Sequence, residues 1–183
     1  MNFKYCVFLI MSVLCLSCKN KNATMEQIAR MQSDVVVLPL DSMDNTGVSP
    51  CVPRLDGYKF IVYSDSSDCS SCSLRKLYQW DELSELSKRY GDGVQFIFIF
   101  SPSKKNQGIF ELAIRNVLSS SLIYMDTTNI FSRFNPHIPC ERRFHTFLLD
   151  ENNNVLLVGN PLENEKIEEM FWQIVEEKLG KRE

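Results

Sequence analysis

The sequence predicts an α/β fold in which helices cover both faces of a mixed central β-sheet. From residue 58 onward, β-rich apolar runs alternate with stretches of helical spacing in the order β-α-β-α-(β)-β-β-α. A strand–helix–strand crossover makes its two strands parallel, whereas a short turn makes two strands antiparallel. We therefore expect a parallel, helix-covered unit in the first half and an antiparallel hairpin followed by a helix in the second.

The residues before the first of these strands predict little regular structure. Residues 19–33 are typical of a polar tether with room for a short helix. Residues 35–40 (VVVLPL) predict a short strand, and Pro39 favours a sheet edge because proline has no N–H to donate. Residues 41–57 are rich in turn-forming residues and predict a loop.

The next elements form a predicted β-α-β unit. Residues 58–63 (YKFIVY) are a β-rich apolar run. Residues 73–90 repeat apolar side chains at intervals of three and four positions, which is typical of a helix, and the glycines of residues 91–93 end it. Residues 94–100 (VQFIFIF) are apolar at six of seven positions, as expected of a strand buried on both faces.

The second half contains weaker signals and one clear hairpin. Its first predicted elements are a loop over residues 102–108, a helix over residues 109–118 and a short strand over residues 122–125. Residues 146–149 and 155–158 are apolar runs on either side of the turn DENNN, which predicts a β-hairpin. Residues 163–179 place apolar side chains on one side, as in an amphipathic helix. Trp80 and Trp172 fall on apolar helix faces, so we expect both in the core.

Length and composition fit one domain with an N-terminal extension. Of the 183 residues, 44% are hydrophobic, which is enough for a sizeable core. The net charge is −3, and charges of both signs are interspersed without a basic block. We therefore expect no nucleic-acid partner.

The first 18 residues predict export from the cytoplasm. Lys4 precedes an apolar run over residues 5–16. This run has the length of a signal peptide and is shorter than the roughly 20 apolar residues that span a bilayer. Its end, Ser17-Cys18, resembles the lipobox of bacterial lipoproteins, which implies a lipidated Cys18 and a membrane-anchored, periplasm-facing protein of the cell envelope. The alternative is a cleaved signal peptide without lipid. The predicted organisation is a lipoprotein signal peptide (1–18), a tether and N-terminal extension (19–50) and a folded domain (51–183).

Export leaves four cysteines in a compartment that permits disulfides: Cys51, Cys69, Cys72 and Cys140. Four thiols allow three pairings, and the sequence does not choose among them. Cys51 and Cys140 are candidates for a structural disulfide or for buried, unpaired thiols.

Cys69 and Cys72 stand where the first predicted strand is followed by a predicted helix. A helix N-terminus stabilises a thiolate through its unpaired N–H groups and its dipole, and Cys72 follows one turn later on the same helix face. Such a dithiol can attack a disulfide through Cys69 and resolve the mixed disulfide through Cys72. The negative charges of Asp65 and Asp68 disfavour a thiolate, so we expect a reductant or isomerase rather than a disulfide donor.

From about residue 58 to 180 the chain resembles the membrane-anchored, extracytoplasmic thiol–disulfide oxidoreductases of the TlpA type, which have a thioredoxin-like fold. The resemblance lies in the segments FIVYSDSSDCSSC, VQFIFIF and HTFLLDENNNVLLVG. It implies that residues 51–183 form a thioredoxin-like domain with Cys69 as nucleophile and Cys72 as resolving cysteine. It also implies periplasmic protein thiols or disulfides and a redox partner as the partners, with no cofactor and no metal.

Three positions depart from the pattern of this family. Asp68 stands where the family usually has tryptophan, Tyr63 stands where thioredoxins often keep a buried acid, and His145 replaces the cis-proline before Thr146. The resemblance places His145, Thr146 and Asp68 at the substrate groove, with His145 packed against the dithiol.

Two alternatives to thiol–disulfide exchange stay open on the sequence. Cys69 and Cys72 can form an inert disulfide in a thioredoxin-fold binding module. Cys69, Cys72 and His145 can also ligate zinc or copper, with Cys140 as a fourth donor, which would make the protein a metal carrier.

Overall fold

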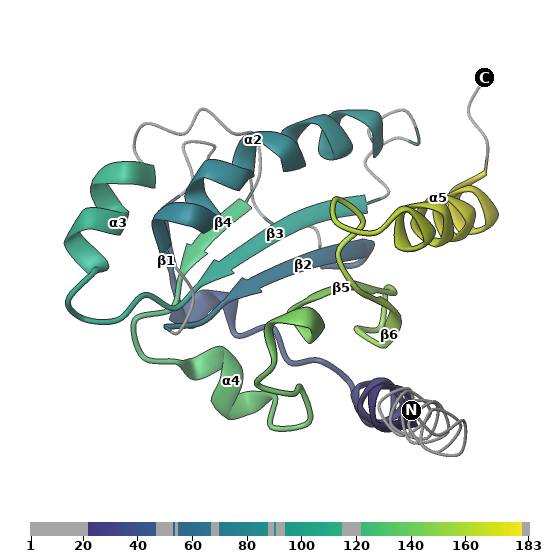
Figure 1. Ribbon diagram of the computed structural model, residues 1–183, viewed down its shortest axis with the longest axis horizontal. Helices are drawn as coiled ribbons and strands as arrows, with labels where there is room; N and C mark the ends of the chain where they lie inside the picture. Colours follow the sequence, from purple (N-terminus) through teal and green to yellow (C-terminus); the bar gives the residue numbers. More distant parts are fainter. Residues whose placement is uncertain are drawn as a thin grey trace, which may run out of the picture.

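The computed structural model describes residues 22–46, 53, 55–66, 70–87, 90, 94–114 and 122–180 (Figure 1). At the centre lies a six-stranded mixed sheet with the strand order β1-β4-β3-β2-β5-β6. The strands are β1 (Asp44–Asn45), β2 (Tyr58–Ser64), β3 (Val94–Phe100), β4 (Leu122–Met125), β5 (Thr146–Leu149) and β6 (Val155–Val158). β2, β3 and β4 are parallel, whereas β5 is antiparallel to β2 and β6 is antiparallel to β5. The expected parallel unit and the expected hairpin are both confirmed.

Helices cover both faces of this sheet, as the sequence predicts. They are α2 (Ser70–Ser87), α3 (Gln107–Ile114), α4 (Ile130–Phe134) and α5 (Glu165–Leu179), and residues 22–31 are also helical. α2, α3 and α5 pack on one face, and α4 packs with the helix of residues 22–31 on the other (Figure 1). Among the described residues, no helix is both long enough and apolar enough to cross a membrane.

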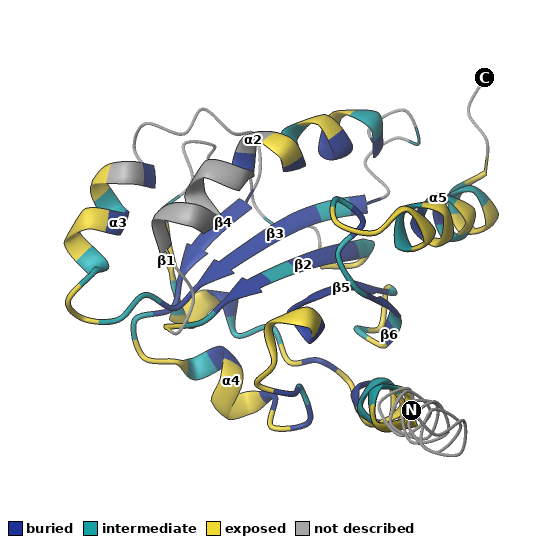
Figure 2. Cartoon of the chain, in the orientation of Figure 1, coloured by how far each residue is buried: buried dark blue, intermediate teal, exposed yellow. Residues whose placement is uncertain are grey.

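The alternation of side chains along β3 divides the core into two layers. Phe96, Phe98 and Phe100 belong to the layer under α2, α3 and α5, while Ile97 and Ile99 belong to the opposite layer. Successive side chains of a strand point to opposite faces, so an almost continuous apolar run supplies both layers at once. Figure 2 shows β3 buried over most of its length, whereas α3 and α5 are exposed on their outer sides. β3 is thus the strand buried on both faces that the sequence predicts.

The prediction of a strand at residues 35–40 is wrong. The Val36 N–H donates to the Asn153 carbonyl oxygen at 3.0 Å, and the Val37 N–H donates to Asn135 Oδ1 at 2.8 Å. Because these N–H groups bond to a turn and to a side chain, they are not available for a ladder with a neighbouring strand. The edge strand beside β4 is instead β1, which lies within the segment expected to be a loop, and β6 forms the opposite edge of the described sheet.

Candidate functional site

The corner between β2 and α2 is where the sequence predicts a redox-active dithiol. β2 and β3 are parallel and end together at Ser64 and Phe100, so their carboxyl ends form one edge of the sheet. α2 begins at Ser70, and Cys72 lies in its first turn. Four residues predicted for functional or structural roles lie outside the described residues: Cys18, Cys51, Asp68 and Cys69.

The beginning of β5 lies at the same edge of the sheet. Thr146 is the register partner of Val62, and the Tyr63 N–H donates to the His145 carbonyl oxygen at 2.8 Å. This antiparallel pairing places His145 and Thr146 beside the end of β2. The structure therefore brings two of the three predicted groove residues next to the end of β2, the strand that precedes the predicted dithiol, and the third, Asp68, lies outside the described residues.

The His145 ring is packed rather than exposed. Its side chain is 3% exposed, and Nε2 lies 3.0 Å from the Pro139 carbonyl oxygen. A carbonyl oxygen only accepts hydrogen bonds, so Nε2 carries the hydrogen and Nδ1 of the neutral ring presents a lone pair. This Nδ1 is buried and has no hydrogen-bond partner among the described residues. The ring centroid also lies 4.9 Å from that of Tyr63.

Tyr63 occupies the position at which the resemblance to thioredoxins leads us to expect a buried acid. It is 7% exposed, and its ring lies between those of Phe131 and His145, at centroid distances of 4.8 and 4.9 Å. Burial raises the pKa of the Tyr63 hydroxyl, although hydrogen bonds with Ser101 and Ser132 act in the opposite direction. The phenol therefore stays protonated near neutral pH and does not supply the negative base that a carboxylate would.

A buried acid does lie near this corner, and sequence reasoning missed it. Asp126 is 1% exposed and accepts the N–H groups of Ile130 and Phe131, each at 2.9 Å. Ser101 Oγ donates to the same carboxylate at 3.4 Å. Asp126 thus satisfies two N–H groups at the start of α4. Its sequence signal is an aspartate directly after an apolar strand, followed by the turn-forming residues 127–129.

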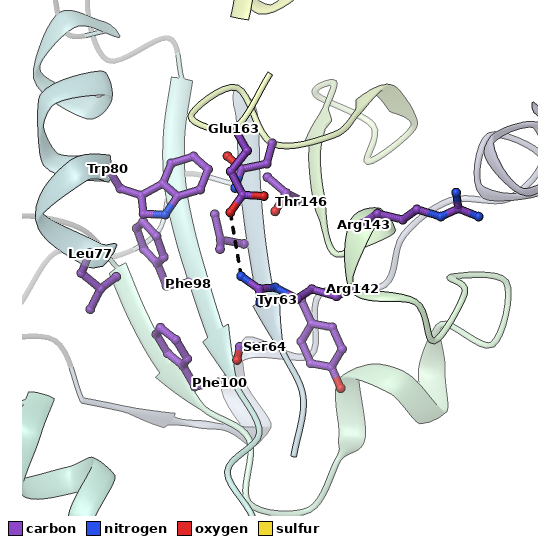
Figure 3. Close-up of a pocket in the computed structure, with 12 residues that line it drawn as sticks. Tyr63, Ser64, Leu77, Trp80, Phe98, Phe100, Arg142, Arg143, Thr146 and Glu163 are labelled. Carbon is purple, nitrogen blue, oxygen red and sulfur yellow. Dashed lines mark ion pairs between the residues drawn. The ribbon is translucent and has the colours of Figure 1, made fainter. Parts of the chain in front are cut away.

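A cavity of about 350 Å³ lies between the sheet and α2, beside the corner (Figure 3). Its inner wall is apolar and mostly aromatic, and is formed by Leu77, Trp80, Phe98 and Phe100. Arg142 and Glu163 form an ion pair of 3.9 Å at the rim, while Arg143 points away from the cavity (Figure 3). We call this space the Trp80 cavity. The expected core position of Trp80 is confirmed, since it is 4% exposed, and Trp172 is half-buried against the same layer.

Cys140 is exposed, so the alternative in which it stays buried as an unpaired thiol is wrong. It lines a second cavity of about 320 Å³ together with Tyr63, Asp65 and His145. Its pairing with Cys51 stays a prediction, because Cys51 lies outside the described residues. Within the described part of the chain, no three histidine, cysteine or acidic side chains are grouped so that they could hold a metal ion.

No protein-family model matches the chain, and no curated protein matches it in sequence. Solved structures do resemble it. A thioredoxin-like protein of Porphyromonas gingivalis has a TM-score of 0.50 at 18% identity, over 80% of this chain and 94% of its own. A thioredoxin-like protein of Bacteroides caccae has a TM-score of 0.48 at 14% identity, over 87% of this chain and 55% of its own. The thioredoxin domain of a thiol-disulfide oxidoreductase of Bacteroides vulgatus has a TM-score of 0.45 at 13% identity, over 66% of this chain and 80% of its own. The chain has a thioredoxin-like fold, as its sequence predicts.

Proposed function

We propose that this protein exchanges disulfides with extracytoplasmic client proteins through Cys69 and Cys72. The observation that carries the proposal is the position of Cys72 in the first turn of α2, the helix that follows β2 in a thioredoxin-like fold. The unpaired N–H groups and the positive end of the dipole of α2 favour a thiolate on Cys69, which directly precedes the helix. His145 and Thr146, beside the end of β2, support a client groove at the same edge.

In the proposed reaction, the Cys69 thiolate attacks one sulfur of a client disulfide. The client S–S bond breaks as the Cys69–client bond forms, and the second client sulfur leaves as a thiolate that takes up a proton. Cys72 then loses its proton to solvent and attacks the Cys69 sulfur, which releases the first client sulfur as a thiol. Two electrons pass from the dithiol to the client. An extracytoplasmic dithiol partner must then reduce the Cys69–Cys72 disulfide.

The charges around the corner favour the reducing direction. Asp65 lies in the described part of the connection between β2 and α2, and its negative charge contributes to the raised pKa of Tyr63 at the end of β2. A second carboxylate, Asp68, directly precedes Cys69 in the sequence. Negative charge disfavours a thiolate, and a less acidic thiol makes the disulfide a weaker oxidant. We therefore propose a reductant or isomerase rather than a disulfide donor.

Reduction of a single-disulfide substrate protein by the pre-reduced chain tests this function. The wild-type protein should reduce the substrate, and Cys69→Ser should abolish the reaction. Cys140→Ser is the matched control, since it removes an exposed thiol that has no part in the mechanism, and it should react at the wild-type rate. The proposal fails if Cys69→Ser reduces the substrate as fast as the wild type, or if neither protein reduces it. The second outcome would favour a redox-inert binding module.

We further propose that a lipid on Cys18 holds the protein to the cell-envelope membrane, with the fold facing the periplasm. The support is the apolar run of residues 5–16 that ends at Ser17-Cys18. Membrane fractions of cells that express the full chain should contain the wild-type protein, whereas Cys18→Ala should move it to the soluble periplasmic fraction. A soluble wild-type protein would contradict the anchor.

Metal carriage is the second candidate function, and one observation favours it. Nδ1 of His145 is buried without a hydrogen-bond partner among the described residues, whereas Nε2 is bonded to Pro139. Nδ1 is therefore the nitrogen that could ligate zinc or copper together with Cys69 and Cys72. A carrier should retain stoichiometric metal after gel filtration, and His145→Ala should release it. Protein that binds no metal under reducing conditions would exclude this candidate.

A further inference from the structure

The Trp80 cavity lies where a client polypeptide would approach the proposed dithiol. It opens at the edge formed by the carboxyl ends of β2 and β3, and Ser64 and Phe100, the last residues of these strands, both line it. Leu77, which also lines it, is five residues after Cys72 on α2. At 1.5 Å per residue, that is about 7.5 Å along the helix axis. Two or three residues of extended chain, at about 3.3 Å each, cover the same length.

The inner wall of the cavity favours an apolar and planar occupant. Trp80, Phe98 and Phe100 belong to the packed core and also line the cavity (Figure 3). Aromatic rings attract one another edge to face, as Trp80 and Phe98 already do at a centroid distance of 6.0 Å. Ser64, Thr146 and Asn160 add polar groups to the lining, and the cavity of about 350 Å³ has room for many waters or for one large side chain.

The rim adds one positive group that can face this occupant. Arg142 reaches over the cavity and pairs with Glu163 at 3.9 Å, and the two side chains are 63% and 52% exposed (Figure 3). An ion pair so long and so exposed contributes at most about 1 kcal/mol. A guanidinium is attracted to the face of an aromatic ring, and it gains no such attraction from an aliphatic side chain.

We propose that the Trp80 cavity receives an aromatic side chain of the client polypeptide, next to the client's reactive cysteine, with Arg142 covering the ring. This inference rests on the proposed thiol–disulfide exchange and names the class of client that the site selects. Binding in the cavity would hold the client disulfide at the corner, which raises the local concentration of the reacting sulfurs. The site would thus prefer proteins that expose a phenylalanine, tyrosine or tryptophan beside a disulfide.

The binding test uses peptides without cysteine, so that it does not depend on exchange. Six-residue peptides carry serine in place of the cysteine and either phenylalanine or alanine two positions away. Trp80 emission in the full chain with Trp172→Phe reports occupancy, because Trp80 is then the only tryptophan. Full burial of a phenylalanine side chain should make the phenylalanine peptide bind about 10- to 100-fold more tightly than the alanine peptide.

Two neighbouring arginines provide the matched pair of variants. Arg142→Gln should weaken the phenylalanine peptide about two- to fivefold and leave the alanine peptide unchanged, as expected for a lost contact between a cation and a ring. Arg143 is also a lining residue, but its guanidinium lies over the Phe144 ring, donates to Thr24 and points away from the cavity, so Arg143→Gln should change neither affinity. Both side chains are exposed, so neither substitution threatens the fold.

The same peptides with cysteine in a mixed disulfide complete the experiment. The phenylalanine peptide should react with Cys69 faster than the alanine peptide, by about the ratio of their affinities. Selective binding without any exchange would overturn the proposed oxidoreductase function and leave the cavity as a binding site for aromatic residues. Exchange at equal rates, with equal binding of both peptides, would overturn the present inference and leave the oxidoreductase standing. Trp80 emission that changes only with protein concentration would also overturn it, since a second copy of the chain would then be the occupant.

Discussion

Replacing Asp126 by alanine should destabilise the protein strongly, because this carboxylate holds the start of α4 from within the core. Asp126 is 1% exposed and accepts the N–H groups of Ile130 and Phe131 at 2.9 Å each. A hydrogen bond to a charged group contributes about 1.5–3 kcal/mol. Two such bonds give an expected loss of about 3–6 kcal/mol, which is a large part of the roughly 5–15 kcal/mol by which most domains are stable.

Urea unfolding under reducing conditions measures this loss as a lower midpoint at an unchanged slope. Asp126→Asn keeps one acceptor oxygen and should lose about half as much. Asp150→Ala is the control, because the Asp150 carboxylate also accepts two main-chain N–H groups, from Asn152 and Asn154 at 2.8 Å, and one side-chain N–H of Asn154 at 2.8 Å, but in an exposed turn. Water can replace those bonds, so we expect a loss of about 1 kcal/mol. Equal losses for Asp126→Ala and Asp150→Ala would refute the argument that burial sets the magnitude.

Substitutions at three further positions probe other parts of the structure. Burial lowers the pKa of His137, so the folded state favours the neutral imidazole. The free energy of unfolding should therefore be highest above the ordinary pKa of about 6.5 and should fall as the pH drops below that value. Urea midpoints of His137→Gln should show a smaller fall, and parallel curves would contradict this assignment. Asn164→Ala removes the side-chain oxygen that accepts two N–H groups at the start of α5, so it should lose about 1 kcal/mol in urea unfolding, most of which Asn164→Ser should restore. Gly159 has φ of 134°, and a Cβ there would lie 3.0 Å from Ile167 Cδ1. Gly159→Ala should therefore lower the melting temperature, and an unchanged melting temperature would contradict this reasoning.

Patterns that repeat along the chain predicted most of the fold. The alternation of phenylalanine and isoleucine in residues 94–100 supplies both core layers, so its burial could be predicted without knowledge of its neighbours. The turn DENNN between two short apolar runs predicted the β5–β6 hairpin for a similarly local reason. The crossover rule then made β2 and β3 parallel, which places the end of β2 at the edge where the dithiol was predicted.

Features that depend on contacts distant in sequence could not be predicted. Residues 35–40 have the composition of a strand, but the bonding of Val37 to Asn135, 98 residues away, removes the segment from the sheet. His145 was predicted from the sequence to shape a groove, and its burial depends on the Pro139 carbonyl and the Tyr63 ring, which only the tertiary structure brings together. Arg142 and Glu163 belong to no recognisable sequence motif. They form the rim of a cavity only because the tertiary structure brings their two segments together.

Trapping of a mixed disulfide by Cys72→Ser tests the central claim most directly. Without the resolving thiol, the first step of the proposed exchange forms a Cys69–client bond that Cys72 can no longer break. Mass spectrometry of the pre-reduced variant after incubation with a disulfide-bonded substrate protein should show a covalent one-to-one adduct that a reducing agent releases and that maps to Cys69. The wild-type protein should instead yield reduced substrate and a Cys69–Cys72 disulfide. An adduct on Cys140, or no adduct while the wild type also leaves the substrate oxidised, would contradict the account.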